Sequence, residues 1–174
     1  MSWDLSSNRI TVIQDNVFNG LQNLSELYLS YNQITVVPEN AFKGLKNISI
    51  LDIEGNQITV LDKRFIKDLP KLKRLAVERN PLHCDCILAE FLSFAKSRKV
   101  TLKYDKEPEC STPGDLTGVL LKDLSLEEMG CYLTTTTKED HTIVTTTSLE
   151  TSGIIIFSYF NPALICLRIL IVIR

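Results

Sequence analysis

The stretch Leu24-Ser-Glu-Leu27-Tyr-Leu29-Ser-Tyr-Asn32-Gln-Ile34 decides the fold, because its pattern returns along the chain at a fixed interval of 24 residues. The asparagines that mark the repeat are Asn8, Asn32, Asn56 and Asn80. The apolar positions around each asparagine repeat with it. A period of this length is typical of a solenoid, in which each repeat forms one coil and stacks on its neighbours.

Each repeat predicts a short strand followed by a tight turn. Leu27 and Leu29 are two residues apart, so they share one face of a strand while the alternate residues point to solvent. The asparagine amide both donates and accepts hydrogen bonds, so it can satisfy backbone groups that a tight coil buries. We therefore expect parallel strands and a ladder of asparagines. Phe65 comes one residue early and Ile66 holds the strict register, which predicts a local adjustment there.

The pattern L-x-x-L-x-L-x-x-N-x-I resembles the leucine-rich repeat family in its extracellular, 24-residue form. Two later runs, Asn80-Pro-Leu-His-Cys84-Asp-Cys86 and Cys110-Ser-Thr-Pro113-Gly-Asp-Leu116-Thr-Gly118, resemble the cysteine-rich cap that closes such proteins at the C-terminal end. The tryptophans that the family usually has near Leu82 and Phe94 are absent. The resemblance covers residues 1–133 and implies an α/β fold, with a curved repeat solenoid over 1–79 and a cap over 80–133.

The resemblance also implies the disulfides of the cap. They are Cys84–Cys110 and Cys86–Cys131, whereas four cysteines alone leave three connectivities open. Apolar residues between 87 and 95 recur at helical spacing and predict a short helix laid across the end of the last coil.

Function is expected on the concave face that the strands present to solvent. In proteins of this family that face binds protein partners, and a receptor or adhesion role follows from the resemblance. Tyrosine and arginine are favoured anchors in interfaces, although any exposed strand face needs polar residues to remain soluble. The candidate residues are Asp4, Glu26, Tyr28, Tyr31, Asp52, Glu54, Arg74, Glu78 and Arg79.

No pattern for catalysis, a metal or a cofactor is found in the sequence. It holds five cysteines and only two histidines, without a nucleophile–base constellation or a phosphate-binding glycine loop. The C-x-C spacing is a poor match to zinc knuckles. With a net charge of −2, nothing indicates nucleic acid. The basic residues between 63 and 74 are either a solvated surface or a site for a heparin-like polyanion.

The C-terminal part changes in composition. Residues 134–152 contain nine threonines and predict an extended stalk, either O-glycosylated or a plain linker. Residues 153–173 are mostly apolar and predict one transmembrane helix. Arg168 and Arg174 at its end place the C-terminus in the cytosol and the repeats outside, at the plasma membrane. A GPI anchor and a secreted matrix protein are the alternatives.

The sequons at Asn23 and Asn47 predict N-glycans at the same position of successive repeats. The chain begins inside a strand motif, without a signal peptide or an N-terminal cap. We therefore expect a fragment or a truncated form of a longer protein. A tail-anchored product is the other reading, with its repeats in the cytosol, its cysteines reduced and its sequons unused.

Overall fold

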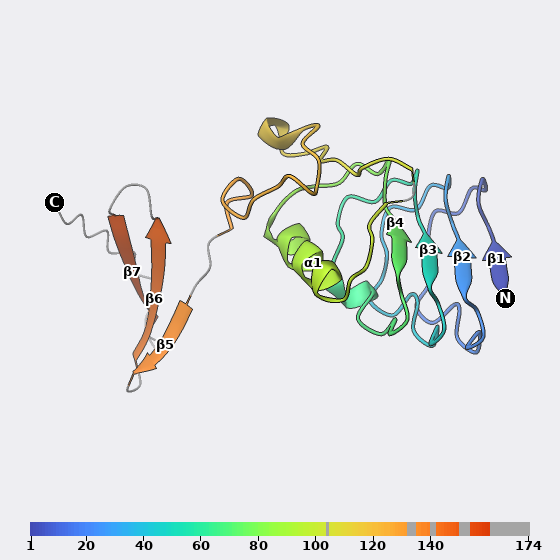
Figure 1. Cartoon of the computed structure of the whole chain (residues 1–174), viewed down its shortest axis with the longest axis horizontal. Coiled ribbons are helices and arrows are strands. Elements are labelled where there is room, and N and C mark those ends of the chain that lie inside the picture. The colour runs from blue at the N-terminus through green and yellow to red at the C-terminus, as the bar shows by residue number, and fades with distance from the viewer. Residues whose placement is uncertain (104, 132–134, 140–141, 150–153, 161–174) are drawn as a thin grey trace. The chain divides into compact units, whose positions relative to one another are not determined.

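The computed structural model describes residues 1–103, 105–131, 135–139, 142–149 and 154–160. The chain divides into two units, Met1–Gly130 and Cys131–Arg174. The first unit carries a parallel sheet of four three-residue strands, one for each repeat: β1 (Ser2–Asp4), β2 (Glu26–Tyr28), β3 (Ile50–Asp52) and β4 (Arg74–Ala76). Figure 1 shows these strands side by side along one face of the stacked coils.

The 24-residue period sets the register of this sheet. Leu27 pairs with Leu51, and Leu51 with Leu75, at the centre of neighbouring strands. All three side chains are fully buried. Trp3 takes the same place in β1. The leucines therefore form one column through the core, as the period predicts.

The predicted asparagine ladder is present. Asn56 donates from Nδ2 to the carbonyls of Ile53 and Leu29 and accepts from the backbone N–H of Ile34, each over 3.0 Å. Asn32 and Asn80 make the corresponding bonds one coil earlier and one coil later. Each amide therefore ties its own turn to the preceding coil and satisfies backbone groups inside the stack.

A stack of phenylalanines runs along the interior on the convex side. Phe18 stacks on Phe42 with ring centroids 5.9 Å apart, Phe42 meets Phe65 edge-on at 6.2 Å, and Phe65 stacks on Phe91 at 5.8 Å. The expected local adjustment lies here. A 3₁₀ helix, η1 (Lys63–Phe65), lets Phe65 and Ile66 both be buried.

The cap closes the last coil. Helix α1 (Cys86–Ser97) is capped at its N-terminus by Asp85, whose carboxylate accepts from the N–H groups of Ile87 and Leu88. The buried face of α1 contains Leu88, Phe91 and Ala95, whereas Ile87, also among the apolar residues between 87 and 95, is exposed. A second 3₁₀ helix, η2 (Gly114–Leu116), follows in the cap loops.

The cap also continues the backbone pattern of the sheet. The N–H of Leu75 donates to the carbonyl of Thr101 over 2.8 Å, so the edge of β4 is paired by the segment that follows α1. The opposite edge strand, β1, has a neighbour on one side only.

The second unit holds an antiparallel sheet of three strands, β5 (Thr135–Glu139), β6 (Thr142–Leu149) and β7 (Ile154–Phe160). The threonine-rich residues expected as an extended stalk form β5 and β6. Strand β7 covers residues 154–160 of the helix predicted over 153–173, and isoleucine, phenylalanine and tyrosine favour strands as well as membrane helices. Residues 153 and 161–173 of that prediction lie outside the described residues. None of the described helices has the length and hydropathy needed to cross a membrane.

We predict that Asn56→Ala lowers the free energy of unfolding by about 3–5 kcal/mol, because it leaves several buried backbone groups without partners. The matched control is Asn8→Ala in the first coil. Asn8 is exposed and, among the described residues, its side chain bonds to the carbonyls of Leu5 and Ser6 in its own turn, so its loss should cost less than about 1 kcal/mol. Denaturant unfolding of the full chain measures both. Equal losses would contradict a ladder that works between coils.

Candidate recognition surface

The predicted concave residues differ in their exposure. Asp4, Tyr31, Arg74 and Arg79 are exposed, and Glu26 and Tyr28 are half-buried. Three acidic residues expected in solvent are buried instead: Asp52, Glu54 and Glu78 are 8%, 6% and 1% exposed. The concave face is therefore less acidic at its surface than the sequence predicts.

Asp52 is buried because its carboxylate accepts a hydrogen bond within the turn that follows β3. Its Oδ1 accepts from the backbone N–H of Glu54 over 3.0 Å. Asp4 accepts the same bond from the N–H of Ser6 two repeats earlier in the stack, over 2.9 Å. At this repeat position an aspartate therefore shapes the end of the strand, and in β3 the neighbouring coils cover it.

Tyr31 is the exposed aromatic group of the surface, with 47% of its side chain accessible. It has a positive φ of 54° at the turn after β2, and Gly55 holds the same repeat position with a φ of 62°. A Cβ on Gly55 would lie 2.8 Å from the Tyr31 ring. The ring of Tyr31 therefore lies directly over Gly55 of the next coil, in space that only glycine leaves open.

Arg79, also at this repeat position, meets Tyr31 from two coils further along. Its guanidinium carbon lies 5.8 Å from the centroid of the Tyr31 ring, and its Nη1 donates to the Tyr31 hydroxyl. Glu54 lies beneath both: Tyr31 donates to its Oε1 over 3.0 Å, and the Arg79 Nε lies 3.2 Å from the same oxygen. We call Tyr31, Glu54 and Arg79, with Glu78 and Asp105 described next, the Tyr31–Arg79 cluster.

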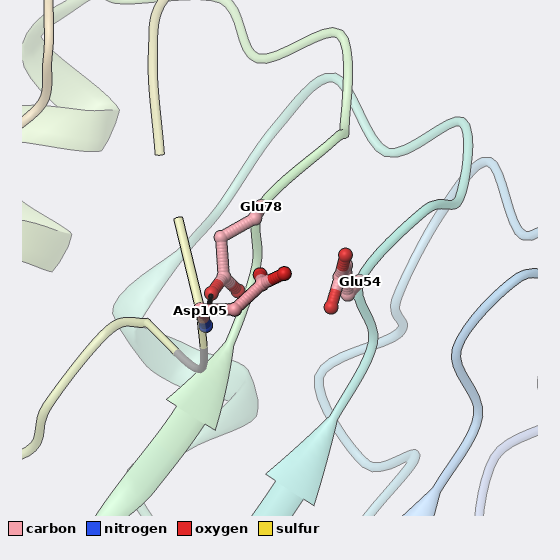
Figure 2. A group of neighbouring side chains, drawn as sticks. All are labelled: Glu54, Glu78 and Asp105. Atoms are coloured by element: carbon pink, nitrogen blue, oxygen red, sulfur yellow. Dashed lines mark hydrogen bonds between the residues drawn. The ribbon is translucent and has the colours of Figure 1, made fainter. Parts of the chain in front are cut away.

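The cap contributes Asp105 to this cluster. The backbone N–H of Asp105 donates to Glu78 Oε1 over 3.2 Å, and its carboxylate lies 3.7 Å from Arg79 Nη2. Figure 2 shows the carboxylates of Glu54, Glu78 and Asp105 together beyond the ends of the strands. The cap thus covers Glu78 and brings a residue that the repeat pattern does not identify, since Asp105 lies outside the period.

These three carboxylates have the spacing of metal ligands, with one oxygen of each within 4.8 Å of the others. Carboxylate oxygens at this spacing could hold a divalent cation. Arg79 already supplies positive charge to Glu54 and Asp105. The guanidinium of Arg79 therefore lies among these carboxylates and forms ion pairs with Glu54 and Asp105.

The electrostatics follow from burial. Burial raises the pKa of Glu54 above the ordinary value of a glutamate, and the hydrogen bond from Tyr31 and the charge of Arg79 oppose part of that rise. The pKa of Tyr31 is raised mainly because its hydroxyl donates to Glu54. Tyr31 therefore stays neutral at physiological pH, and its hydroxyl continues to donate its proton to Glu54.

A groove of about 320 Å³ continues from the cluster between the last coil and the cap. Beside Arg79 it is lined by Lys106, Glu107 and Glu109. Both signs of charge therefore face this groove, which suits a polar segment of a partner with charges of its own.

The cap cysteines and the sequon asparagines lie within the described residues. Cys84 and Cys110 form a disulfide with Cα atoms 5.8 Å apart. Cys86 and Cys131 are each disulfide-bonded as well, and their pairing with each other stays a prediction. Of the sequons, Asn23 is exposed, whereas Asn47 is half-buried and donates to the carbonyl of Gln22 over 2.8 Å.

Comparison with known proteins agrees with the repeat geometry. The family model for the Leucine rich repeat matches residues 1–58. Vasorin of Mus musculus is 38% identical over 68 residues, which are 39% of this chain and 10% of that protein. Vasorin of Homo sapiens is 39% identical over 59 residues, which are 34% of this chain and 9% of that protein. The chain thus spans about a tenth of the length of these curated relatives.

Two solved structures share the architecture. Human 5T4 (Wnt-activated inhibitory factor 1, trophoblast glycoprotein) aligns with a TM-score of 0.62 at 25% identity, over 74% of this chain and 46% of that one. A chain in the octameric complex of Latrophilin 3, Unc5D and FLRT2 (LRR) aligns with a TM-score of 0.62 at 26% identity, over 75% of this chain and 39% of that one.

We predict that Gly55→Ala costs about 2 kcal/mol or more of unfolding free energy, from about 1–2 kcal/mol of left-handed backbone strain and the displacement of the Tyr31 ring. In a Tyr31→Ala background the ring is absent, so only the backbone strain should remain. Denaturant unfolding of the single and double variants measures the coupling. The same cost for Gly55→Ala in both backgrounds would show that the ring does not depend on Gly55.

Proposed function

We propose that this chain, which is a leucine-rich repeat protein of the extracellular type, binds a protein partner through its concave face at the end beside the cap. The observation that carries the proposal is the Tyr31–Arg79 cluster. It presents an exposed tyrosine and an exposed arginine whose positions are fixed by Gly55 and Glu54. Tyrosine and arginine are the residue types that most often dominate binding energy in protein interfaces.

The fixed geometry supports this role because ordering flexible side chains on binding is costly, at roughly 0.5–1.5 kcal/mol for each. Tyr31 and Arg79 already hold each other, so much of that cost is met in the free protein. Glu26, Tyr28 and Arg74 extend the surface along the strands. The groove beside Arg79 offers polar groups for the rim of a contact.

The relatives support a protein partner. FLRT2 (LRR) is in a complex with Latrophilin 3 and Unc5D, and we extend the class of function, recognition of another cell-surface protein, to this chain. The proposed role is recognition without catalysis. Its histidine beside the disulfide, His83, uses Nδ1 in a 2.8 Å hydrogen bond with Thr112 Oγ1, which suits a structural role in the cap.

We also propose that the chain is a single-pass protein of the plasma membrane with its repeats outside the cell. The repeats (1–79) and cap (80–133) would be carried on the threonine-rich segment 134–152, with residues 153–173 as the anchor. Support comes from the hydropathy and the C-terminal arginines of the sequence and from the disulfide of the cap, since disulfides persist in oxidising compartments.

Glycosylation tests this topology. The chain expressed as written in cultured cells should migrate faster after glycosidase treatment, because Asn23 and Asn47 would face the secretory lumen. Asn23→Gln and Asn47→Gln should each remove one glycan, and the double variant should show no shift. Surface labelling of intact cells reports arrival at the plasma membrane. An unshifted, unlabelled chain would contradict the topology and favour a tail-anchored, cytosol-facing product.

Binding tests the concave face. The full chain, purified in a neutral detergent and immobilised, is probed with Latrophilin 3 (Lec, Olf), Unc5D (Ig, Ig2, TSP1) and a panel of other cell-surface ectodomains. For a partner that binds, Tyr31→Ala and Arg79→Ala should each weaken affinity by about thirtyfold, equivalent to about 2 kcal/mol for an interface anchor. Val36→Ala and Lys43→Ala, at exposed positions outside the strands, are the controls. Partners that are indifferent to both cluster variants would contradict this site.

A further inference from the structure

A second groove, of about 690 Å³, lies at the edge where the chain enters the strands, away from the Tyr31–Arg79 cluster. Four positively charged side chains line it: Lys71 and Lys73 before β4, and Arg98 and Lys99 at the end of α1. The other lining residues are neutral, so the groove contains no carboxylate. We call it the basic groove.

The backbone ladder of the solenoid brings these residues together. The N–H of Ser49 donates to the carbonyl of Ser25 over 2.7 Å, that of Lys73 to Ser49 over 2.9 Å, and that of Thr101 to Lys73 over 2.9 Å. Ser49, Lys73 and Thr101 therefore lie on successive rungs, at the spacing of roughly 4.8 Å between neighbouring strands. The cap continues the row, which places Arg98 and Lys99 beside Lys71 and Lys73.

The charges of the basic groove are not neutralised by acids. Lys71 donates to the Asn47 amide oxygen over 2.6 Å, and Arg98 donates to the carbonyls of Ile66, Lys67 and Leu69. These partners are neutral. Lys73 and Lys99 form no salt bridge with any carboxylate of the described residues.

The other cations of the same sequence region are paired. Lys63 meets Glu90 at 2.7 Å, Arg64 meets Asp62 at 2.6 Å, and Lys67 pairs with Glu39. Lys63 and Arg64 lie in η1, and Glu90 lies on α1. Within the basic stretch between 63 and 74, Lys63, Arg64 and Lys67 thus pair with acids, whereas Lys71 and Lys73 line the groove without a salt bridge to a carboxylate of the described residues.

We propose that the basic groove binds a sulfated polysaccharide of the heparin type. Four cations gathered in one groove, Lys71, Lys73, Arg98 and Lys99, match a polymer with repeating anionic groups, and clustered lysines and arginines attract such polyanions. Thr101 adds a hydroxyl, and Asn47 an amide. No aromatic side chain lines the groove, which disfavours single-stranded nucleic acid, because its bases stack on such groups. Sulfated polysaccharides also lie outside cells, where a disulfide-bonded cap persists.

Asn47 links this groove to glycosylation, because it is both a lining residue and a sequon asparagine. An N-glycan at Asn47 would occupy space at the groove. The test is therefore made after an endoglycosidase has trimmed N-glycans to a single sugar.

The test measures affinity of the full chain, in a neutral detergent, for immobilised heparin at near-physiological salt. The groove variant is Lys71→Glu/Lys73→Glu/Lys99→Glu, which leaves Arg98 and its backbone bonds in place. The matched control is Arg9→Glu/Lys43→Glu/Lys122→Glu, with the same change in net charge at exposed cations outside both grooves. We expect the groove variant to bind about tenfold more weakly or worse, and to lose affinity less steeply with added salt, because fewer counterions are released. The control should change by less than about twofold.

Equal losses in the two triple variants would overturn the proposal, because net charge alone would then explain binding. No binding of heparin by the unchanged chain would overturn it, and so would equal binding of desulfated heparin. Tighter binding of a single-stranded oligonucleotide than of heparin would replace the polysaccharide with nucleic acid. Circular dichroism of the groove variant must match that of the unchanged chain, and the concave-face partner assay is independent of this site.

Discussion

The bonds of the buried asparagines between coils are the constraint on which the rest of the structure depends. Each coil is too thin to bury its own turn, so backbone groups inside the stack need partners that only a neighbour can place. Asn32, Asn56 and Asn80 supply them in the same geometry each time. Because each amide bonds both its own turn and the coil before, it fixes the register at 24 residues. Every feature that depends on neighbouring coils follows from that register.

The Tyr31–Arg79 cluster is one such consequence. Tyr31, Gly55 and Arg79 hold the same repeat position, each with a positive φ, so the register places them in one row. Gly55, in the middle of the row, has no side chain that would separate Tyr31 from Arg79. Tyr31 can then cross the intervening coil and meet Arg79. The turn after each strand is needed for folding. The same turn also places the ring of Tyr31 and the guanidinium of Arg79 where a partner can reach them.

The period alone was sufficient to predict the coils, the asparagine ladder, the strands and the adjustment at Phe65, because those features repeat and a repeat is visible in one sequence. It was not sufficient to predict the burial of Glu54 and Glu78. Alternation assigns both to the solvent side, and they are buried by Tyr31, Arg79 and the cap segment at Asp105. That segment has no period, so its path over the last coil was not predictable. Helical spacing likewise does not show which of the apolar residues between 87 and 95 are buried: Ile87 is exposed, whereas Phe91 packs on Phe65.

The two surfaces differ because strand geometry separates residues that are neighbours in sequence. Lys73 lines the basic groove at the entry of β4, whereas Arg74 opens the strand itself and belongs to the concave row. Acidic side chains gather past the far ends of the strands, where Arg79 balances them, and no carboxylate lines the entry edge at Lys71 and Lys73. Although the net charge is only −2, acidic groups therefore gather at one end of the strands and basic groups at the other. A protein partner at one end and a polyanion at the other would use separate groups, so neither contact requires the other to be released.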